Sequence, residues 1–187
     1  MLSQMAAERK RGVPLRSDDS DPLRGVEDRG GRINNLYRCL ANSPVLLEAW
    51  TDFAWTLRAD CETPRTLREL LILRAAQLTG CEYLWDDHVR FGKEAGLSNA
   101  QIEALSCWRE SEIFERGERA ALGLAEELVT TGRVSNESLE AVESQFPSGQ
   151  VVELVLTVGF YAMVPRVLDA LRVPLMWQPQ AGVPPFT

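Results

Sequence analysis

The sequence predicts an all-α protein, a compact bundle of roughly seven or eight helices. Apolar residues recur along most of the 187 residues at the spacing of helix faces, and no stretch alternates between apolar and polar residues for long. Signals for the start of a helix recur too, because Ser43-Pro44 and Thr63-Pro64 each place a capping side chain before a proline. Hydrophobic residues make up 45% of the chain and charged residues 25%, a composition that allows one sizeable core.

Four helices are predicted between residues 43 and 106, each from a start or stop signal. A proline after a capping residue starts the first two, a glycine ends the second and the third, and a capping box starts the fourth. The signals are Ser43-Pro44 for the first helix, Thr63-Pro64 and Gly80 for the second, Cys81 and Gly96 for the third, and Ser98 with Gln101 for the fourth.

Three more helices are predicted in the second half of the chain. They run from Glu118 to Thr131 before Gly132, over a short segment capped by Ser135, and from about Gln150 to Arg172. Pro165 removes a backbone donor from the last of them, which predicts a kink there.

Composition divides the chain into three parts. Residues 1–30 are rich in Arg, Asp, Gly and Pro without periodicity, which predicts an irregular N-terminal arm. Residues 31–176 form the helical domain, and residues 177–187 form a Pro-rich tail. The N-terminus lacks the apolar core of a secretory signal, and the apolar run from Val151 to Val164 contains Glu153 and ends at Pro165. We therefore expect a cytoplasmic protein without a membrane partner.

Charge and cysteine content exclude several classes of function. The formal net charge is −7 and there is no basic stripe, which argues against nucleic acid as a partner. The four cysteines are widely spaced and include no CxxC pair, which argues against a disulfide framework and a zinc site. We expect reduced thiols and no metal.

The segment GCEYLWDDHVRFGKEAGLS gathers the residues best suited to chemistry. On a helix, Cys81, Leu84, Trp85 and His88 share one face, so a thiol and an imidazole lie along one stripe. His88 is the sole histidine, and any imidazole that transfers protons near neutral pH must be this one. Cys81 stands at the start of its helix, where the helix dipole favours a thiolate. The structural alternative is a satisfied core histidine and a small buried cysteine.

The stretch RELLILRAAQLTGCEYLWDDHVRFGKEAGLSNAQIEAL resembles the core of the carboxymuconolactone decarboxylase and AhpD-like family. The matching positions are Glu69, Cys81 and His88, followed by Gly96-Leu97-Ser98, and the likeness extends from about Ile33 to Pro174. The resemblance implies an AhpD-like bundle that assembles into a trimer or hexamer. It also implies that Glu69 is a proton-relay partner of His88.

Two positions depart from the family pattern. Peroxidase members carry CxxCxxxH, in which a second thiol resolves the oxidised first one, and many other members have a glutamate at that second position. This sequence has Leu84 there. In addition, Tyr161 is followed by Ala162 where relatives often have Asn. The usual dithiol cycle is therefore unavailable at this motif, and the usual acid is absent too.

Three functions remain, in order of preference. The first is a cofactor-independent lyase or isomerase that acts on a small unsaturated carboxylic acid or lactone. The second is a thiol peroxidase or redox protein that uses Cys81, and the third is a non-catalytic binding or assembly protein. In the lyase or isomerase, His88 transfers the proton, Glu69 adjusts the proton affinity of His88, and Cys81 helps to shape the pocket. The residues expected to contact the substrate are Tyr83, Leu84 and Trp85.

Overall fold

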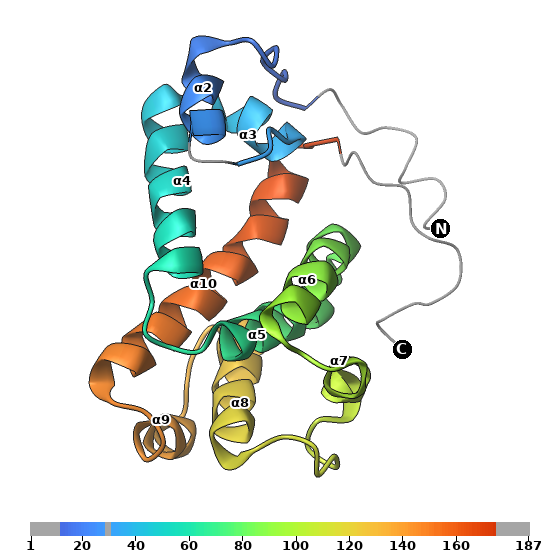
Figure 1. Cartoon of the computed structure of the whole chain (residues 1–187), viewed down its shortest axis with the longest axis vertical. Helices are drawn as coiled ribbons and strands as arrows, with labels where there is room; N and C mark the ends of the chain where they lie inside the picture. The colour runs from blue at the N-terminus through green and yellow to red at the C-terminus, as the bar shows by residue number, and fades with distance from the viewer. Residues whose placement is uncertain (1–11, 29–30, 175–187) are drawn as a thin grey trace. The chain divides into compact units, whose positions relative to one another are not determined.

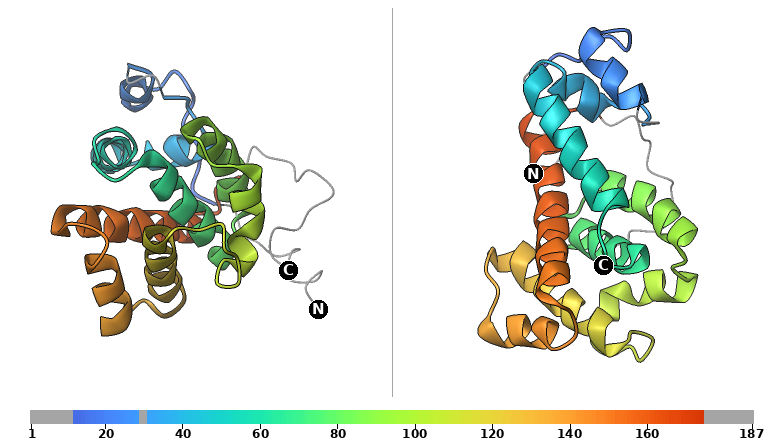
Figure 2. Two further views of the ribbon diagram at one scale, coloured as in Figure 1. Left: turned by 60° about the horizontal axis from the view of Figure 1, so that its bottom comes forward. Right: turned by 60° about the vertical axis from the view of Figure 1, so that its left-hand side comes forward.

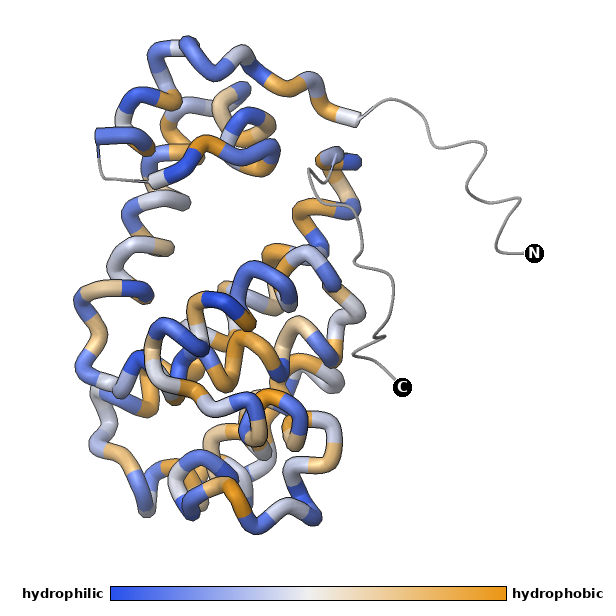
Figure 3. Tube along the Cα trace, turned by 45° about the vertical axis from the view of Figure 1, so that its right-hand side comes forward, coloured by the Kyte–Doolittle hydropathy of each residue, from blue (hydrophilic) through white to orange (hydrophobic). Residues whose placement is uncertain are grey.

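The computed structural model describes residues 12–28 and 31–174, and within them it confirms the all-α prediction. Apolar and polar residues alternate along the helices, as expected for amphipathic segments packed on a core (Figure 3). These residues contain α-helices and one short 3₁₀-helix, and no strand. The helices are α2 (Asp21–Asp28), α3 (Asn35–Leu40), α4 (Pro44–Ala59), α5 (Arg65–Thr79), α6 (Glu82–Ala95), α7 (Asn99–Ala104), η2 (Leu105–Cys107), α8 (Arg116–Thr131), α9 (Asn136–Glu143) and α10 (Ser148–Ala170).

The described residues divide into two compact units. The first contains residues 12–28, 31–54 and 166–174, and the second contains residues 55–165. The predicted tail, residues 177–187, and residues 1–11 of the predicted arm lie outside the described residues.

The first unit corrects the prediction of an irregular arm, because residues Asp21–Asp28 form helix α2. This helix buries Leu23 and Val26. The first and last segments of this unit are joined by a hydrogen bond, because the backbone N–H of Val13 donates to the carbonyl of Leu171 at 3.1 Å. Two apolar contacts and such backbone bonds order a segment whose composition alone suggests irregular structure.

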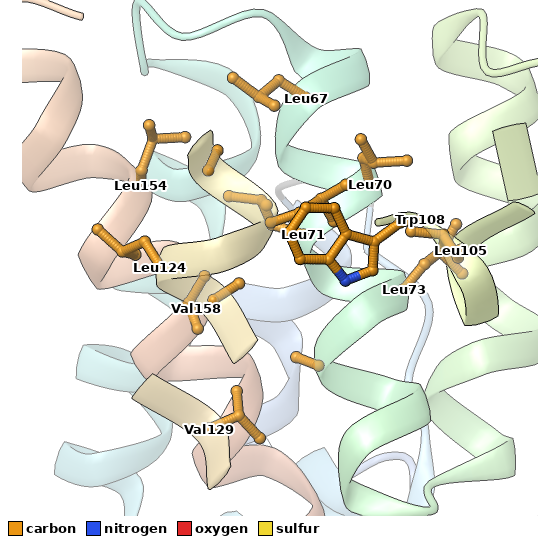
Figure 4. Close-up of a cluster of buried hydrophobic side chains, with 14 of the residues drawn as sticks. Leu67, Leu70, Leu71, Leu73, Leu105, Trp108, Leu124, Val129, Leu154 and Val158 are labelled. Carbon is orange, nitrogen blue, oxygen red and sulfur yellow. The ribbon is translucent and has the colours of Figure 1, made fainter. Parts of the chain in front are cut away.

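Helix α5 is the central helix of the second unit and contacts both α6 and α8 (Figures 1 and 2). Every residue from Leu67 to Leu73 is buried, as expected for a helix that is covered on all sides. Figure 4 shows the leucines of this helix among the side chains of the core. Two of its buried residues, Arg68 and Glu69, are charged, and they require partners.

The loop before α5 is fixed by two charged side chains. The Glu153 carboxylate on α10 accepts hydrogen bonds from the backbone N–H of Glu62 at 2.9 Å and of Thr63 at 2.8 Å. The Arg68 guanidinium donates to the Thr63 carbonyl and, at 3.1 Å, to the Arg58 carbonyl at the end of α4. Helix α5 therefore starts at Arg65, one residue after the predicted start, and its first turn has a defined position.

Helix α10 is long and apolar enough to cross a membrane by length and composition. Half of its most apolar window is buried inside the protein, however, which is typical of a core helix. Pro165 lies within the helix, as the sequence indicates.

Candidate functional site

The site lies where α6 passes close to α5 in the second unit (Figure 1). Gly92 lies on the face of α6 that meets α5, since a Cβ atom there would lie 3.7 Å from the Cβ of Glu69, an ordinary contact distance. His88 precedes Gly92 by one helical turn, so it lies on the same buried face of α6. Close packing of the two helices thus brings the sole histidine to Glu69.

A short hydrogen bond joins the two residues. His88 Nδ1 lies 2.6 Å from Glu69 Oε2. The Glu69 side chain is completely buried, and His88 is 5% exposed. The other carboxylate oxygen, Glu69 Oε1, forms an ion pair with Arg65, which stands one turn earlier on α5. Glu69 Oε1 accepts no hydrogen bond from the described part of the chain, so the charge of Arg65 is what compensates this oxygen for the loss of water.

Aromatic rings enclose the imidazole. Tyr161 of α10 meets it edge to face, with ring centroids 4.8 Å apart, and Phe91 does so at 5.5 Å. The guanidinium of Arg58 stacks over Phe91 at 4.6 Å and that of Arg90 at 4.2 Å. The ring is therefore held by apolar edges and one hydrogen bond. Its other nitrogen, Nε2, makes no hydrogen bond to the residues that the structure describes.

Cys81 differs from the expectation of a stabilised thiolate. It is the N-cap of α6 and is partly buried. Burial raises the pKa of its thiol, and this effect outweighs the backbone hydrogen bonds from Leu84 and Tyr83, which lower it. The loss of water around the sulfur therefore disfavours a thiolate at this position.

The three residues expected to contact substrate lie in different surroundings. Leu84 is buried, with 4% of its surface exposed, and shares a face of α6 with His88 and Gly92. Trp85 is partly buried and packs against the hydrophobic core, and Tyr83 is partly buried. Within the described residues, no group of three His, Cys, Asp or Glu side chains could hold a metal ion.

Residues 44–127 match the model of the carboxymuconolactone decarboxylase family. The matched segment is a little under half of the chain, and it is similar to that family. The matched segment contains Glu69, Cys81 and His88, so both partners of the buried hydrogen bond lie within it.

Two proteins with similar sequences are themselves named as uncharacterized. The protein YdfG of Bacillus subtilis (strain 168) is 33% identical over 97 residues, which is 51% of this chain and 66% of YdfG. The protein YnjA of Escherichia coli (strain K12) is 26% identical over 122 residues, which is 64% of this chain and 66% of YnjA. The chain thus spans just under two thirds of the length of each.

Solved structures share the AhpD-like fold. A protein of unknown function from Agrobacterium tumefaciens, linked by name to the antioxidant defence protein AhpD, is 25% identical with a TM-score of 0.66, covering 79% of this chain and 99% of that one. A cysteine-to-alanine variant of the debrominase Bmp8 in complex with 2,3,4-tribromopyrrole has a TM-score of 0.75 at 17% identity, covering 95% of each chain. The second likeness shows the fold alone. An AhpD-like fold favours a soluble protein.

The sequence analysis did not predict three contacts of this site. They are the ion pair of Arg65 with Glu69 and the packing of Phe91 and of Tyr161 on the imidazole. Arg65 had a signal, because an arginine four residues before a glutamate lies beside it on a helix. Phe91 had one as well, because it stands three residues after His88 on α6 and so lies beside it. Tyr161 had none, because a contact between α6 and α10 depends on tertiary packing.

Proposed function

We propose that this chain is a cofactor-independent enzyme of the lyase or isomerase type, in which His88 transfers a proton on a small unsaturated carboxylic acid or lactone. The observation that supports the proposal is the 2.6 Å contact between His88 Nδ1 and the buried Glu69 carboxylate. A carboxylate in this position accepts a hydrogen bond from Nδ1–H and fixes the orientation of the ring. The same arrangement of carboxylate and imidazole serves general base catalysis elsewhere.

The chemistry follows from which nitrogen is engaged. Because Nδ1 faces Glu69, Nε2 is the nitrogen that exchanges protons with substrate. In an isomerisation, Nε2 removes a proton from a carbon next to a carbonyl group and returns it to another carbon. In a decarboxylation, the electron pair of the broken C–C bond moves to the substrate carbon as CO₂ leaves, and protonated His88 supplies the proton. Neither sequence requires a metal or an oxidant.

A screen of unsaturated acids and lactones tests the proposal. Turnover should fall by about 10²–10⁴-fold in His88→Ala, the contribution typical of general acid–base catalysis, and should persist with a chelator present. Arg90→Gln is the matched control, since Arg90 is exposed and stacks on Phe91 but does not contact the imidazole pair. Turnover that is unchanged in His88→Ala, or that a chelator abolishes, would contradict the proposal.

A thiol peroxidase is the second candidate, favoured by the likeness to the Agrobacterium tumefaciens protein linked by name to AhpD. In this reaction the Cys81 thiolate gives two electrons to a peroxide, forming a sulfenic acid and releasing water or an alcohol. Mass spectrometry after mild peroxide treatment would show Cys81 oxidised faster than Cys107, which is exposed and serves as the control. Equal rates would exclude this function. If neither candidate activity is found, the chain is a binding or assembly protein.

We further propose a homo-oligomeric, cytoplasmic protein, with a trimer or hexamer as the expected assembly. Val152, Leu156 and Met163 of α10 are 57%, 44% and 40% exposed and recur on one side of that helix, a surface suited to contact between copies. Light scattering that gives the mass of a monomer would contradict the assembly. All four cysteines are free, which fits a reducing compartment.

A further inference from the structure

Arg65 is held between two helices. One of its guanidinium nitrogens pairs with Glu69 Oε1, and another donates to the Arg58 carbonyl at the end of α4, at 2.9 Å. Its side chain is 26% exposed, whereas that of Glu69 is completely buried. Two anchors therefore fix the guanidinium at the boundary between solvent and the buried carboxylate.

We propose that Arg65 is a positioning residue that keeps the His88 imidazole neutral and ready to accept a proton. The inference rests on the proposed function, since it names what sets the charge state of the base. With Arg65 present, one positive and one negative charge balance when His88 is neutral. A further proton would leave a net positive charge on a group that is almost fully buried.

Removal of Arg65 changes this balance. The Glu69 and His88 pair would then carry a net negative charge with a neutral imidazole, and burial disfavours such a state. The pair would retain one proton near neutral pH, shared across the 2.6 Å contact. A base that already holds a proton cannot take another from substrate, so the variant needs higher pH to act.

Other groups around the imidazole do not replace Arg65 in this role. Among the described residues, Arg65 and His88 are the basic side chains with an ion-pair contact to Glu69. Arg58 and Arg90 lie over Phe91, and Arg90 is paired with Glu94 at 3.2 Å. The titratable and charged groups around the ring include Glu69 and Arg65 from α5, Tyr161 from α10, Arg58 from α4, and Arg90 and Glu94 from α6 itself. Arg68 of α5 is also buried and interacts electrostatically with Glu69, but its guanidinium donates to the carbonyls of Thr63 and Arg58 and makes no ion-pair contact with Glu69.

The sole histidine makes the test direct. Protein labelled with ¹³C and ¹⁵N in histidine gives a single imidazole, whose signals report its protonation and its tautomer across a pH titration. In wild type we expect a neutral ring at pH 7 with its proton on Nδ1. In Arg65→Gln we expect the midpoint of proton uptake to move up by about one pH unit or more, the effect of a nearby charge. Arg65→Lys, which keeps the positive charge, should have a midpoint close to that of wild type. Arg90→Gln should leave the midpoint unchanged.

Several results would overturn the proposal. A wild-type ring that is positively charged at pH 7 would do so without any variant, even if Arg65→Gln failed to fold. So would a midpoint in folded Arg65→Gln that equals that of wild type, or an equal shift in Arg90→Gln. These titrations need no substrate, so they remain decisive if the substrate screen finds no turnover. Conversely, turnover that is as fast in His88→Ala as in wild type would refute the proposed function and leave the titration result intact.

Discussion

Arg65, Glu69 and His88 form a triad of contacting polar side chains, and replacing all three by apolar residues is predicted to leave the protein at least as stable as wild type. The triple variant is Arg65→Met, Glu69→Leu and His88→Leu. Glu69 is completely buried and His88 is 5% exposed, so both have lost nearly all contact with water. Substitution of buried ion pairs by well-packed apolar residues is often neutral or stabilising by about 1–4 kcal/mol, because no charge then has to leave water. The triad is therefore expected to serve function rather than folding.

A single change should behave in the opposite way. Glu69→Leu leaves His88 Nδ1 without its partner at 2.6 Å, which removes a charge-assisted hydrogen bond of about 1.5–3 kcal/mol. Loss of the Arg65 pair adds up to about 1 kcal/mol, since Arg65 is 26% exposed and can turn to water. Burial of the leucine offsets about 1.5 kcal/mol. We expect a net loss of up to about 2.5 kcal/mol in the free energy of unfolding.

Equilibrium unfolding in urea at pH 7, followed by far-UV circular dichroism, measures both variants against wild type. The reasoning requires the triple variant to be more stable than Glu69→Leu alone, although it carries two further substitutions. A triple variant that is less stable than the single one would refute it. The triad would then be a stabilising element of the fold, and its geometry would say little about catalysis.

Three further changes test other parts of the second unit. Burial opposes ionisation of Glu126, but hydrogen bonds, that from Trp108 among them, hold its pKa below the ordinary value. The ionised Glu126 thus contributes to stability above a pH of about 4.3, and this contribution is lost as the pH falls further. In Glu126→Gln, the midpoint of unfolding in urea should therefore fall less steeply between about pH 6 and pH 3 than in wild type. Gly92→Val should cost about 2 kcal/mol and displace α6, whereas Gly92→Ala should stay within about 1 kcal/mol of wild type in thermal unfolding, because only the end of Leu97 must move. Gly80→Ala should lose about 1 kcal/mol in the same assay, since Gly80 has φ +65° and no atom stands near its missing Cβ.

The parts of the fold that sequence predicts well are those specified by local chemistry. Ser98 and Gln101 form the predicted capping box, and Ser135 caps α9 through the N–H of Ser138. Gly80 and Gly132 end their helices in the left-handed conformation that favours glycine. Each of these signals operates within a few residues, so no knowledge of the tertiary structure is needed.

Errors arose where tertiary contacts decide the local structure. Helix α2 has a glycine within it, Gly25, and only two buried residues, so its sequence gives little evidence of a helix. Thr63 was expected to cap α5, yet its hydroxyl accepts a hydrogen bond from Arg68 at 3.1 Å, and Glu153 receives the N–H of Thr63. The partner that displaces the expected cap is 90 residues away in sequence, beyond the reach of any local rule.

The candidate site shows the same division. Helical spacing predicts that Leu84 and His88 share a face, and both are buried. The approach of Glu69 to His88 was implied only by the family resemblance, and the structure places their side-chain atoms 2.6 Å apart. The thiolate expected at Cys81 from its place at the start of a helix is opposed by burial, which raises the pKa of the thiol.

Redox chemistry at Cys81 and proton transfer at His88 require different surroundings for their side chains. A peroxidatic cysteine needs a thiolate and a nearby resolving thiol, but burial raises the pKa of Cys81, and Leu84 occupies the position of the resolving cysteine. A proton-transferring histidine needs an oriented neutral ring beside a buried carboxylate, and Glu69 provides that carboxylate. The requirements for proton transfer are thus met by side chains in contact, whereas those for dithiol redox chemistry are opposed by burial and by a leucine. This asymmetry is the physical reason to rank proton transfer first.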